Sequence, residues 1–246
     1  MNLFYHIGRY FILISKVFQR PEKMGMYSSQ FFKEVVQLGI QSMGIITIIS
    51  FFMGAVITIQ TASNIDSALI PLSTVGFATR QTVLLELSPT IIALILAGKV
   101  GSNIASEIGT MRVTEQIDAL EIMGVNSASY LILPKIVAAV FVNPFLIVLS
   151  MAIGIFGGWV AGTFTGIVPS IDYIAGIQSD FDTFSVTYAL IKTLFFAFVV
   201  TSIPAYHGYY ANGGALEVGR SSTKGVVYSS IVILIMNYVL TQLLLI

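Results

Sequence analysis

Few residues of this sequence could take part in chemistry. It has no cysteine, and its two histidines, His6 and His207, stand far apart and belong to no metal-binding motif such as H-E-x-x-H. A phosphate-binding loop needs G-x-x-x-x-G-K-[ST], but the only Gly-Lys pair, Gly98-Lys99, is followed by valine. The G-x-S-x-G motif of serine hydrolases does not occur either. The sequence therefore predicts a chain that is not itself an enzyme and has neither a metal site nor a cofactor of its own.

Two ionisable residues, Glu86 and Lys192, fall within segments that are apolar enough to cross a membrane. Ionisable groups inside spans are costly, and they usually face the interior of a bundle, a cavity or each other. The two residues have opposite charges and similar predicted depths near the same side of the membrane. Two interpretations remain open: a structural ion pair between two spans, or a site where the two charged groups meet a substrate.

Membrane-spanning helices must position these residues. The chain of 246 residues is 56% hydrophobic and 10% charged, whereas soluble domains are about 25% charged. Its mean hydropathy is +0.88. Its net charge is zero and it lacks a basic face, which excludes a nucleic-acid partner. Because a spanning helix needs about 20 apolar residues, we expect an all-α integral membrane protein with five spans, at roughly 38–60, 83–104, 136–161, 183–205 and 225–246.

The first 34 residues are expected to form an amphipathic helix on the membrane surface. Their basic positions Arg9, Lys16, Arg20 and Lys23 alternate with aromatic and aliphatic residues. An irregular, solvated segment is the alternative. The predicted spans place ten Lys and Arg on the N-terminal side, whereas the loops of the other side hold only Arg80, together with Asp66, Asp172, Asp180 and Asp182. By the positive-inside rule we expect a cytoplasmic N-terminus, and five spans then place the C-terminus on the opposite side of the membrane.

Small residues recur at every fourth position in two stretches. One stretch is Ala93, Ala97, Gly101, Ala105 and Gly109, and the other is Gly154, Gly158, Gly162 and Gly166. Small side chains at this spacing let helix backbones approach closely in lipid. Packing within the chain and a dimer seam both fit the spacing, and we favour packing within the chain.

Residues 106–123 keep a helical period beyond the second span. Val113, Ile117 and Leu120 share one face, while acidic residues at 115, 118 and 121 share another. Gly124 is expected to end this helix, and Lys99, near the cytoplasmic end of the span, is expected to extend to the interface. A short two-faced helix between spans suits a cytoplasmic partner, although a solvated helix without a partner fits the pattern equally well.

The segment ELSPTIIALILAGKVGSNIASEIGTMRVTEQIDALEIMGV, residues 86–125, strongly resembles the MlaE family, the permease subunits of bacterial ABC systems that move phospholipids. The motifs LPK, GIFGGW, ALIKTLFFA and HGYYANGGALEVGRSSTKGVVYSS follow in the family's order. The resemblance covers residues 35–246. Two departures are Leu85, where many relatives have arginine, and residues 62–80, which match poorly.

The resemblance implies a homodimer that encloses a phospholipid cavity, a cytoplasmic ABC ATPase that binds the ATP, and a periplasmic MCE-domain protein. In some relatives a STAS-domain protein also binds the ATPase. The resemblance places Glu86, Leu87 and Lys192 near the cavity. If the two charged residues form a substrate site, Lys192 would meet a lipid phosphate while Glu86 orients it or forms part of a gate; the structural ion pair remains the alternative. The resemblance also implies a coupling helix at roughly 107–124, with ATPase contacts from Glu107, Met111, Arg112, Glu115, Gln116, Asp118, Leu120 and Glu121.

Two other classes of protein fit the sequence less well. A stand-alone secondary transporter of an amphipathic substrate would need ion-coupling carboxylates near the middle of the membrane, often in repeated halves. The sequence has no internal repeat, and Glu86 is its only carboxylate within a span. A structural scaffold would explain neither Lys192 nor the small residues that lead into the cytoplasmic helix.

Overall fold

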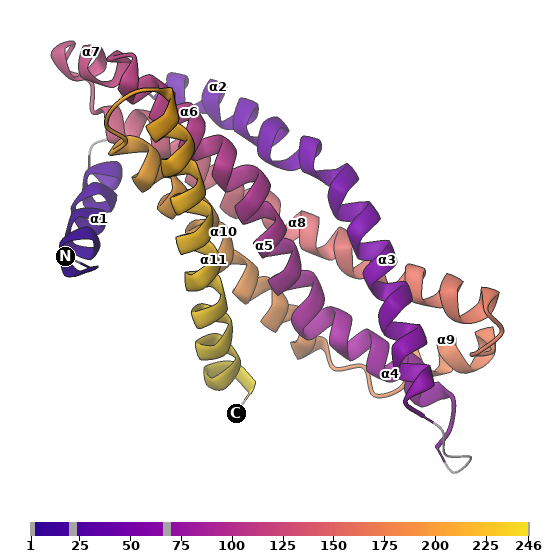
Figure 1. The fold of residues 1–246 in the computed structure, drawn as a ribbon. Coiled ribbons are helices and arrows are strands. Elements are labelled where there is room, and N and C mark those ends of the chain that lie inside the picture. The colour runs from indigo at the N-terminus through magenta and orange to yellow at the C-terminus, as the bar shows by residue number, and fades with distance from the viewer. Residues whose placement is uncertain (1–2, 20–23, 66–69, 246) are drawn as a thin grey trace. The chain divides into compact units, whose positions relative to one another are not determined.

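The computed structural model describes residues 3–19, 24–65 and 70–245, and every regular element among them is a helix (Figure 1). Arg20, Lys23 and Asp66, used above to predict the surface helix and the orientation, lie outside these residues. The elements are α1 (Leu3–Phe18), α2 (Met24–Glu34), η1 (Val35–Ile40), α3 (Gln41–Ser63), α4 (Ser73–Thr82), η2 (Val83–Ile91), α5 (Ile92–Leu96), η3 (Ala97–Gly101), α6 (Ser102–Val113), α7 (Gln116–Ile122), α8 (Ser127–Phe164), α9 (Ser170–Gln178), α10 (Thr183–Tyr209) and α11 (Ala215–Leu245); η marks π-helix.

Five helices of the described chain are long and apolar enough to cross a membrane, which confirms the predicted number of spans. Each helix is longer than the apolar segment predicted for it, because polar residues at its ends continue the same helix. The five helices are Tyr27–Ser63, Ser73–Val113, Ser127–Phe164, Thr183–Tyr209 and Ala215–Leu245.

The N-terminal region differs from the expected single surface helix over residues 1–34. Its described residues, 3–19 and 24–34, form two helices, α1 and α2, and α2 continues directly through η1 into α3. The last residues of the expected surface helix therefore belong to the first spanning helix. Hydropathy alone missed this continuation, because Lys33 and Glu34 interrupt the apolar run without interrupting the helix.

By the contacts between its residues the chain divides into two compact units. Unit 1 comprises Met1–Gln41, Ala93–Asn143 and Leu194–Ile246, and unit 2 comprises Ser42–Ile92 and Pro144–Thr193. The boundaries at 143/144 and 193/194 fall inside α8 and α10. Hydropathy could not predict this division, because the division follows the contacts between helices and not the ends of apolar segments.

Unit 2 is held together by close approach of helix backbones at glycines. A Cβ atom built on Gly54 of α3 would lie 1.8 Å from the carbonyl oxygen of Gly154 on α8, and one on Gly157 would lie 2.2 Å from that of Phe51. In the same way α9 packs along α4 at Gly176, whose Cβ would lie 1.9 Å from the carbonyl oxygen of Ser73 (Figure 1). Only glycine allows these contacts.

Arg80, expected in a loop, lies in α4 and is 1% exposed. Its guanidinium donates hydrogen bonds to backbone carbonyl oxygens of Ile177 at 2.5 Å, Ser179 at 2.7 Å and Asp180 at 3.2 Å. These carbonyls lie at the C-terminal end of α9, where helix carbonyls lack partners of their own. Arg80 therefore joins α4 to the end of α9 within unit 2.

In unit 1, α11 packs along α6 and η3, and the first series of small residues contacts both α10 and α11. Ala97 and Ala105 are 0% exposed. A Cβ atom on Gly101 would lie 2.9 Å from Cγ of Pro204, and one on Gly208 would lie 2.6 Å from the carbonyl oxygen of Ala105. In the other series, Gly158 contacts Thr58 and Tyr173 within unit 2, while Gly166 is exposed at the end of α8. Apart from Gly166, both series thus serve contacts within the chain.

Candidate functional site

Unit 2 brings Glu86 and Lys192 together. The Lys192 ammonium donates hydrogen bonds to Oε1 of Glu86 at 2.9 Å, to the Tyr188 hydroxyl at 2.8 Å and to the carbonyl oxygen of Leu85 at 3.2 Å. The Lys192 side chain is 0% exposed, whereas that of Glu86 is 42% exposed. The cation is therefore fully buried and contacts three oxygen atoms, and the carboxylate is the accessible part of the pair.

A backbone carbonyl of the segment that contains the E-L-x-P motif takes part in this site. Leu85, Glu86 and Pro89 lie in η2, a π-helical segment whose hydrogen bonds span five residues. Pro89 has no amide hydrogen and therefore leaves one backbone hydrogen bond of this segment unmade. Lys192, which is 107 positions from Leu85, donates to the carbonyl oxygen of Leu85. The η2 segment and Lys192 thus form one site.

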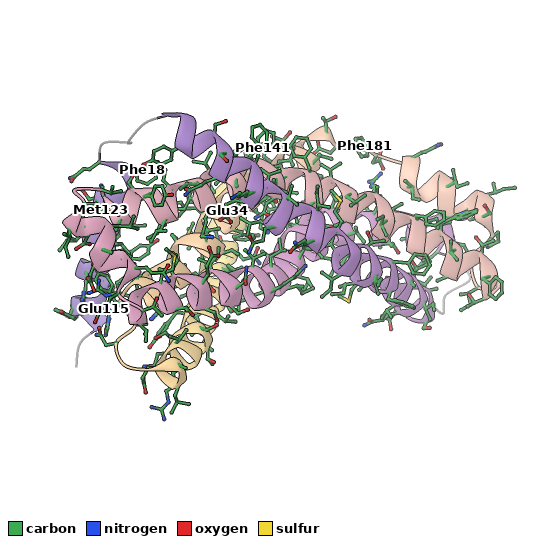
Figure 2. The ribbon with its side chains drawn as sticks, turned by 90° about the horizontal axis from the view of Figure 1, so that it is seen from above. Phe18, Glu34, Glu115, Met123, Phe141 and Phe181 are labelled. Atoms are coloured by element: carbon green, nitrogen blue, oxygen red, sulfur yellow. The ribbon has the colours of Figure 1, made fainter. Side chains whose placement is uncertain are left out.

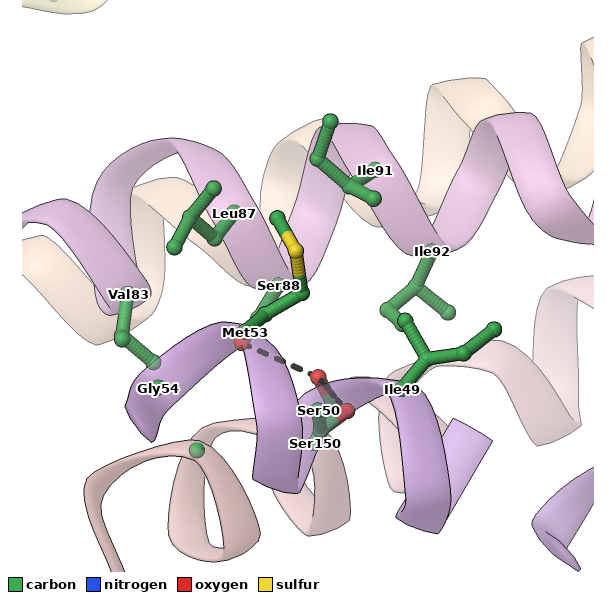
Figure 3. A pocket seen from close by; sticks show the side chains of 11 residues that line it. Ile49, Ser50, Met53, Gly54, Val83, Leu87, Ser88, Ile91, Ile92 and Ser150 are labelled. Atoms are coloured by element: carbon green, nitrogen blue, oxygen red, sulfur yellow. Dashed lines mark hydrogen bonds between the residues drawn. The ribbon is translucent and has the colours of Figure 1, made fainter. Parts of the chain in front are cut away.

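Leu87 lines a small cavity of about 10 Å³ in unit 2 (Figure 3). Its walls are mainly aliphatic, with three buried serines whose hydroxyls form a chain: Ser50 donates to Ser150 at 2.8 Å, and Ser150 donates to Ser88 at 3.1 Å. The volume is about that of a single water probe. Leu87 therefore belongs to packing between α3 and η2 in this conformation, and the cavity is far too small for a lipid.

A second buried lysine, Lys135 of α8, forms an ionic cluster in unit 1. Its ammonium lies 2.5 Å from Oε1 of Glu34 and 2.8 Å from Oε2 of Glu107. The Lys135 side chain is 4% exposed, that of Glu34 is 12% exposed, and that of Glu107 is 42% exposed. The cluster joins α2, α6 and α8, so Glu107, expected at the ATPase contact, is engaged in an ion pair within the chain.

The region expected to form one coupling helix over 107–124 contains a break. The spanning helix ends with α6 at Val113, and α7 begins at Gln116. Between them Glu115 has a φ of 61° in the left-handed region, which a residue with a Cβ atom seldom adopts. Arg112 bridges the break through a 2.7 Å contact with Asp118. The helical periodicity was thus correct on both sides of a corner that the pattern does not reveal.

The C-terminal end of α7 is fixed as the sequence predicts. Gly124 has a φ of 78°, its amide donates to the carbonyl of Glu121, and the amide of Val125 donates to that of Leu120. This pair of hydrogen bonds is the Schellman motif. The Glu121 carboxylate accepts hydrogen bonds from Ser127 and Tyr209, both at 2.9 Å, and these bonds lower its pKa. The short helix is therefore anchored at both ends.

The outer surface of α7 is apolar at its tip. Ile122 is 87% exposed and Met123 is 68% exposed, and Figure 2 shows Met123 and Glu115 at the same end of the ribbon. Among the predicted coupling residues, Glu115 and Gln116 are exposed, whereas Met111 and Leu120 are half-buried. We name the exposed residues Glu115, Gln116, Ala119, Ile122 and Met123 the α7 surface. The sequence reading missed Ile122 and Met123, although two large apolar residues before a helix-ending glycine were a visible signal.

The sequence matches the family described as Permease MlaE over residues 31–243. A probable ABC transporter permease protein of Rickettsia bellii is 35% identical over 237 residues, covering 96% of this chain and 91% of that protein. A probable ABC transporter permease protein of Synechocystis is 35% identical over 212 residues, covering 86% and 80%. The intermembrane phospholipid transport system permease protein MlaE of Haemophilus influenzae is 31% identical over 246 residues, covering 99% and 93%.

These matches extend over nearly the whole chain and include all five spanning helices, the Glu86–Lys192 pair and the α7 surface. They agree with the resemblance inferred from the motifs. The chain is a multi-pass membrane protein that belongs to the MlaE permease family.

Proposed function

We propose that this chain is the membrane-spanning subunit of an ABC transporter that moves phospholipid between bacterial membranes. The match to the Haemophilus phospholipid permease over 99% of the chain is the observation that carries this proposal. The chain would act as a homodimer around a lipid cavity. A separate ATPase would supply the energy, an MCE-domain protein would exchange lipid on the periplasmic side, and a STAS-domain protein would bind the ATPase in systems that have one.

The distribution of charge supports the proposed orientation. The segments predicted on the N-terminal side hold ten of the 12 Lys and Arg residues, whereas the loops of the other side hold only Arg80, which is buried. Basic residues in short loops favour the cytoplasmic side. We therefore place the N-terminus and the α7 surface in the cytoplasm, the C-terminus in the periplasm, and the chain in the inner membrane.

The α7 surface is the proposed ATPase contact. Its exposed Ile122 and Met123 suit an apolar cleft on the partner, and Glu115 beside them suits a basic rim. The anchors at both ends of α7 support transmission of force, because a helix held by Arg112–Asp118 and by Glu121 moves together with the spans to which it is fixed. Glu107 would act through Lys135 rather than by contact with the ATPase.

Lys192 is the proposed phosphate contact in the open state of the transporter. In the structure it is paired with Glu86, so a lipid phosphate would have to replace the half-exposed carboxylate. Exchange of one anion for another keeps the buried ammonium compensated throughout, which avoids the cost of an unpaired buried charge. In this proposal Lys192 pairs with Glu86 in one state of the transporter and with a lipid phosphate in the other.

Purification of the tagged chain from its native membrane in nanodiscs, followed by mass spectrometry, tests the proposed function. We expect an ABC ATPase, an MCE-domain protein and bound phospholipid to co-purify with a dimer of the chain. A chain that carries lipid but never an ATPase, at any detergent strength, would favour a stand-alone secondary transporter.

Replacement of both Ile122 and Met123 by serine tests the ATPase contact. We expect the affinity for the ATPase to fall about 30-fold or more, because hot-spot apolar residues at interfaces contribute about 1–2 kcal/mol each and 1.4 kcal/mol corresponds to a factor of about ten. The matched control is Phe164→Ser, a 93% exposed apolar residue at the end of α8. Equal ATPase binding by the double variant and the control would contradict the proposed contact.

A further inference from the structure

Unit 1 contains a polar pocket that the proposed function does not use. Its volume is about 430 Å³, within the range of small-molecule sites. Its lining comes from one side of η1 and the start of α3, and from η3 and α6 opposite. We name it the Lys99 pocket; it is lined by Gln37, Leu38, Gln41, Lys99, Val100, Ser102, Asn103 and Ser106.

Contacts at both ends of the Lys99 pocket fix how its two walls face each other. At one end the Lys99 ammonium donates a hydrogen bond to the backbone carbonyl of Gln41. At the other end Lys135 joins Glu34 to Glu107. Along either wall these ends are two helical turns apart, or about 10 Å. The pocket thus lies between an exposed lysine and a buried ionic cluster, and contacts hold its two walls together at both ends.

The polar groups of the pocket suit a phosphate ester. Lys99 is exposed and has three N–H donors, of which one is used by Gln41, so the ammonium has donors left for an anion. The amides of Gln37 and Asn103 and the hydroxyl of Ser106 line the same space and make no hydrogen bond to another described residue. An ammonium together with neutral donors is the combination that binds phosphate oxygens.

The position of the pocket selects a lipid as the source of that phosphate. Both walls belong to spanning helices, and the pocket lies one to two turns inward from the ionic cluster at residues 34, 107 and 135. Buried Leu38 and Val100 form the apolar part of the lining. Val36 and Ile40, next to Gln37 and Gln41 on the helix, are 47% and 56% exposed. A lipid with its head in the pocket would rest its acyl chains on this apolar face.

We propose that the Lys99 pocket binds the phosphate ester headgroup of a phospholipid of the cytoplasmic leaflet. This inference rests on the proposed function and adds to it a second lipid site, separate in sequence and in structural unit from the Glu86–Lys192 pair. Such a site would hold a lipid as it enters or leaves the transporter from the inner leaflet. It also gives Lys99 a role other than simple extension to the membrane interface.

The absence of cysteine from the chain makes a direct test possible. A Ser106→Cys variant places a single thiol in the pocket, and its rate of reaction with a water-soluble maleimide is measured in the full complex. We expect dihexanoyl phosphatidylglycerol at four times its dissociation constant to slow the reaction about fivefold, because occupancy lowers the free fraction by that factor. Dihexanoylglycerol, which has no phosphate, should leave the rate unchanged.

Two lysine substitutions made in the Ser106→Cys background show which charge is needed. Lys99→Gln should abolish protection and Lys99→Arg should retain most of it. Lys224→Gln removes an exposed positive charge elsewhere in unit 1 and should leave protection intact. Protection that survives Lys99→Gln would overturn the proposal.

Other outcomes separate the competing occupants. Equal protection by inorganic phosphate at the same concentration would assign the pocket to a free anion and overturn the lipid assignment. Formation of a disulfide between two copies of the Ser106→Cys variant, without protection by lipid, would assign the pocket to a dimer contact. If the wild-type complex transports lipid but lipid does not protect the Ser106→Cys thiol, the proposed lipid site in the Lys99 pocket is wrong and the proposed function still stands. Absence of transport by the wild type would instead contradict the proposed function.

Discussion

Among the residues that the structure describes, each unit contains one buried lysine, and the two lysines are bound in different ways. Lys135 of unit 1 is held by two carboxylates, of which Glu34 is itself largely buried. Lys192 of unit 2 is held by one half-exposed carboxylate, a phenol and a backbone carbonyl. Removal of Lys135 would strand a buried negative charge, whereas removal of Lys192 would leave a carboxylate that water can reach.

This difference contrasts a cluster that joins three helices with a pair whose carboxylate is accessible. Three helices meet at Lys135, and Oε2 of Glu34 is buried without a hydrogen-bond partner among the described residues, so the buried Glu34 carboxylate depends on Lys135 to compensate its charge. Two of the partners of Lys192, the Tyr188 hydroxyl and the carbonyl of Leu85, are neutral groups that departure of Glu86 would leave in place. The comparison shows that burial of a charged residue does not by itself identify a binding site. The exposure of its partner distinguishes a candidate binding site from a structural ion pair.

The largest expected effect comes from Lys135→Met, which keeps the apolar stem but removes the ammonium. We expect a loss of about 3–5 kcal/mol in the free energy of unfolding, because the buried Glu34 carboxylate loses its counter-ion. Thermal or denaturant unfolding in nanodiscs measures the loss. Glu34→Gln in the Lys135→Met background should restore part of the lost free energy of unfolding. If this second substitution restores none, the claim that Lys135 compensates a buried Glu34 charge is wrong.

The next effect concerns the packing of unit 2. Gly54→Ala places a Cβ atom against the backbone of Gly154, which cannot move as a side chain can, and we expect a loss of about 2–3 kcal/mol. Gly44→Ala on the same helix is the matched control, because no atom lies within 4 Å of its Cβ and alanine favours a helix. The chain's single tryptophan, Trp159, lies in unit 2, so its fluorescence reports on this unit. Equal unfolding midpoints for the two variants would contradict the close approach.

Much of the fold followed from hydropathy, since five apolar segments predict the five spanning helices. The joints did not. Thr114 and Glu115 fit the helical period, yet Glu115 turns the chain by adopting a left-handed conformation. Arg80 was expected in a loop because the positive-inside rule only counts basic residues. The rule cannot detect the backbone carbonyls at the end of α9 to which the buried Arg80 side chain donates hydrogen bonds.

The candidate site was only partly predictable for a related reason. Opposite charges at similar depth suggested that Glu86 and Lys192 could meet, and the structure brings them together. Lys135, Glu34 and Glu107 are separated by 101 and 28 positions, and no periodicity links residues so far apart in different helices. The Lys99 pocket depends on the register of two antiparallel walls, which the contacts between helices determine.

A smaller effect sharpens the comparison of the two lysines. Lys192→Met, the same substitution as in unit 1, should cost about 1–2 kcal/mol of stability, because the half-exposed Glu86 can be hydrated when its partner is lost. Transport should nevertheless fall at least tenfold relative to wild type, a loss equivalent to about 1.4 kcal/mol in the barrier. Lys192→Arg should preserve more transport than Lys192→Met. Normal transport by a merely less stable Lys192→Met variant would leave only the structural ion pair.

The smallest expected effect is a response to acid at the end of α7. Hydrogen bonds from Ser127 and Tyr209 lower the pKa of Glu121 below its ordinary value of 4.5. A carboxylate with a lowered pKa stabilises the folded state above pH 4.5, and this contribution is lost as the pH falls through the folded-state pKa. Because Glu121 is exposed, we expect Glu121→Gln to lower the unfolding midpoint at pH 6 by only about 1–2 °C.

The difference between wild type and Glu121→Gln should shrink as the pH falls below 4.5, since the wild-type carboxyl is then protonated as well. Glu115→Gln is the matched control, because the Glu115 side chain makes no hydrogen bond to another described residue and the substitution removes the same charge from the same surface. A midpoint difference that is constant from pH 6 to about pH 3 would show that the Glu121 hydrogen bonds do not depend on its ionised form. In that case α7 would be anchored by packing at Ile117, which is 0% exposed, rather than by the charge at its end.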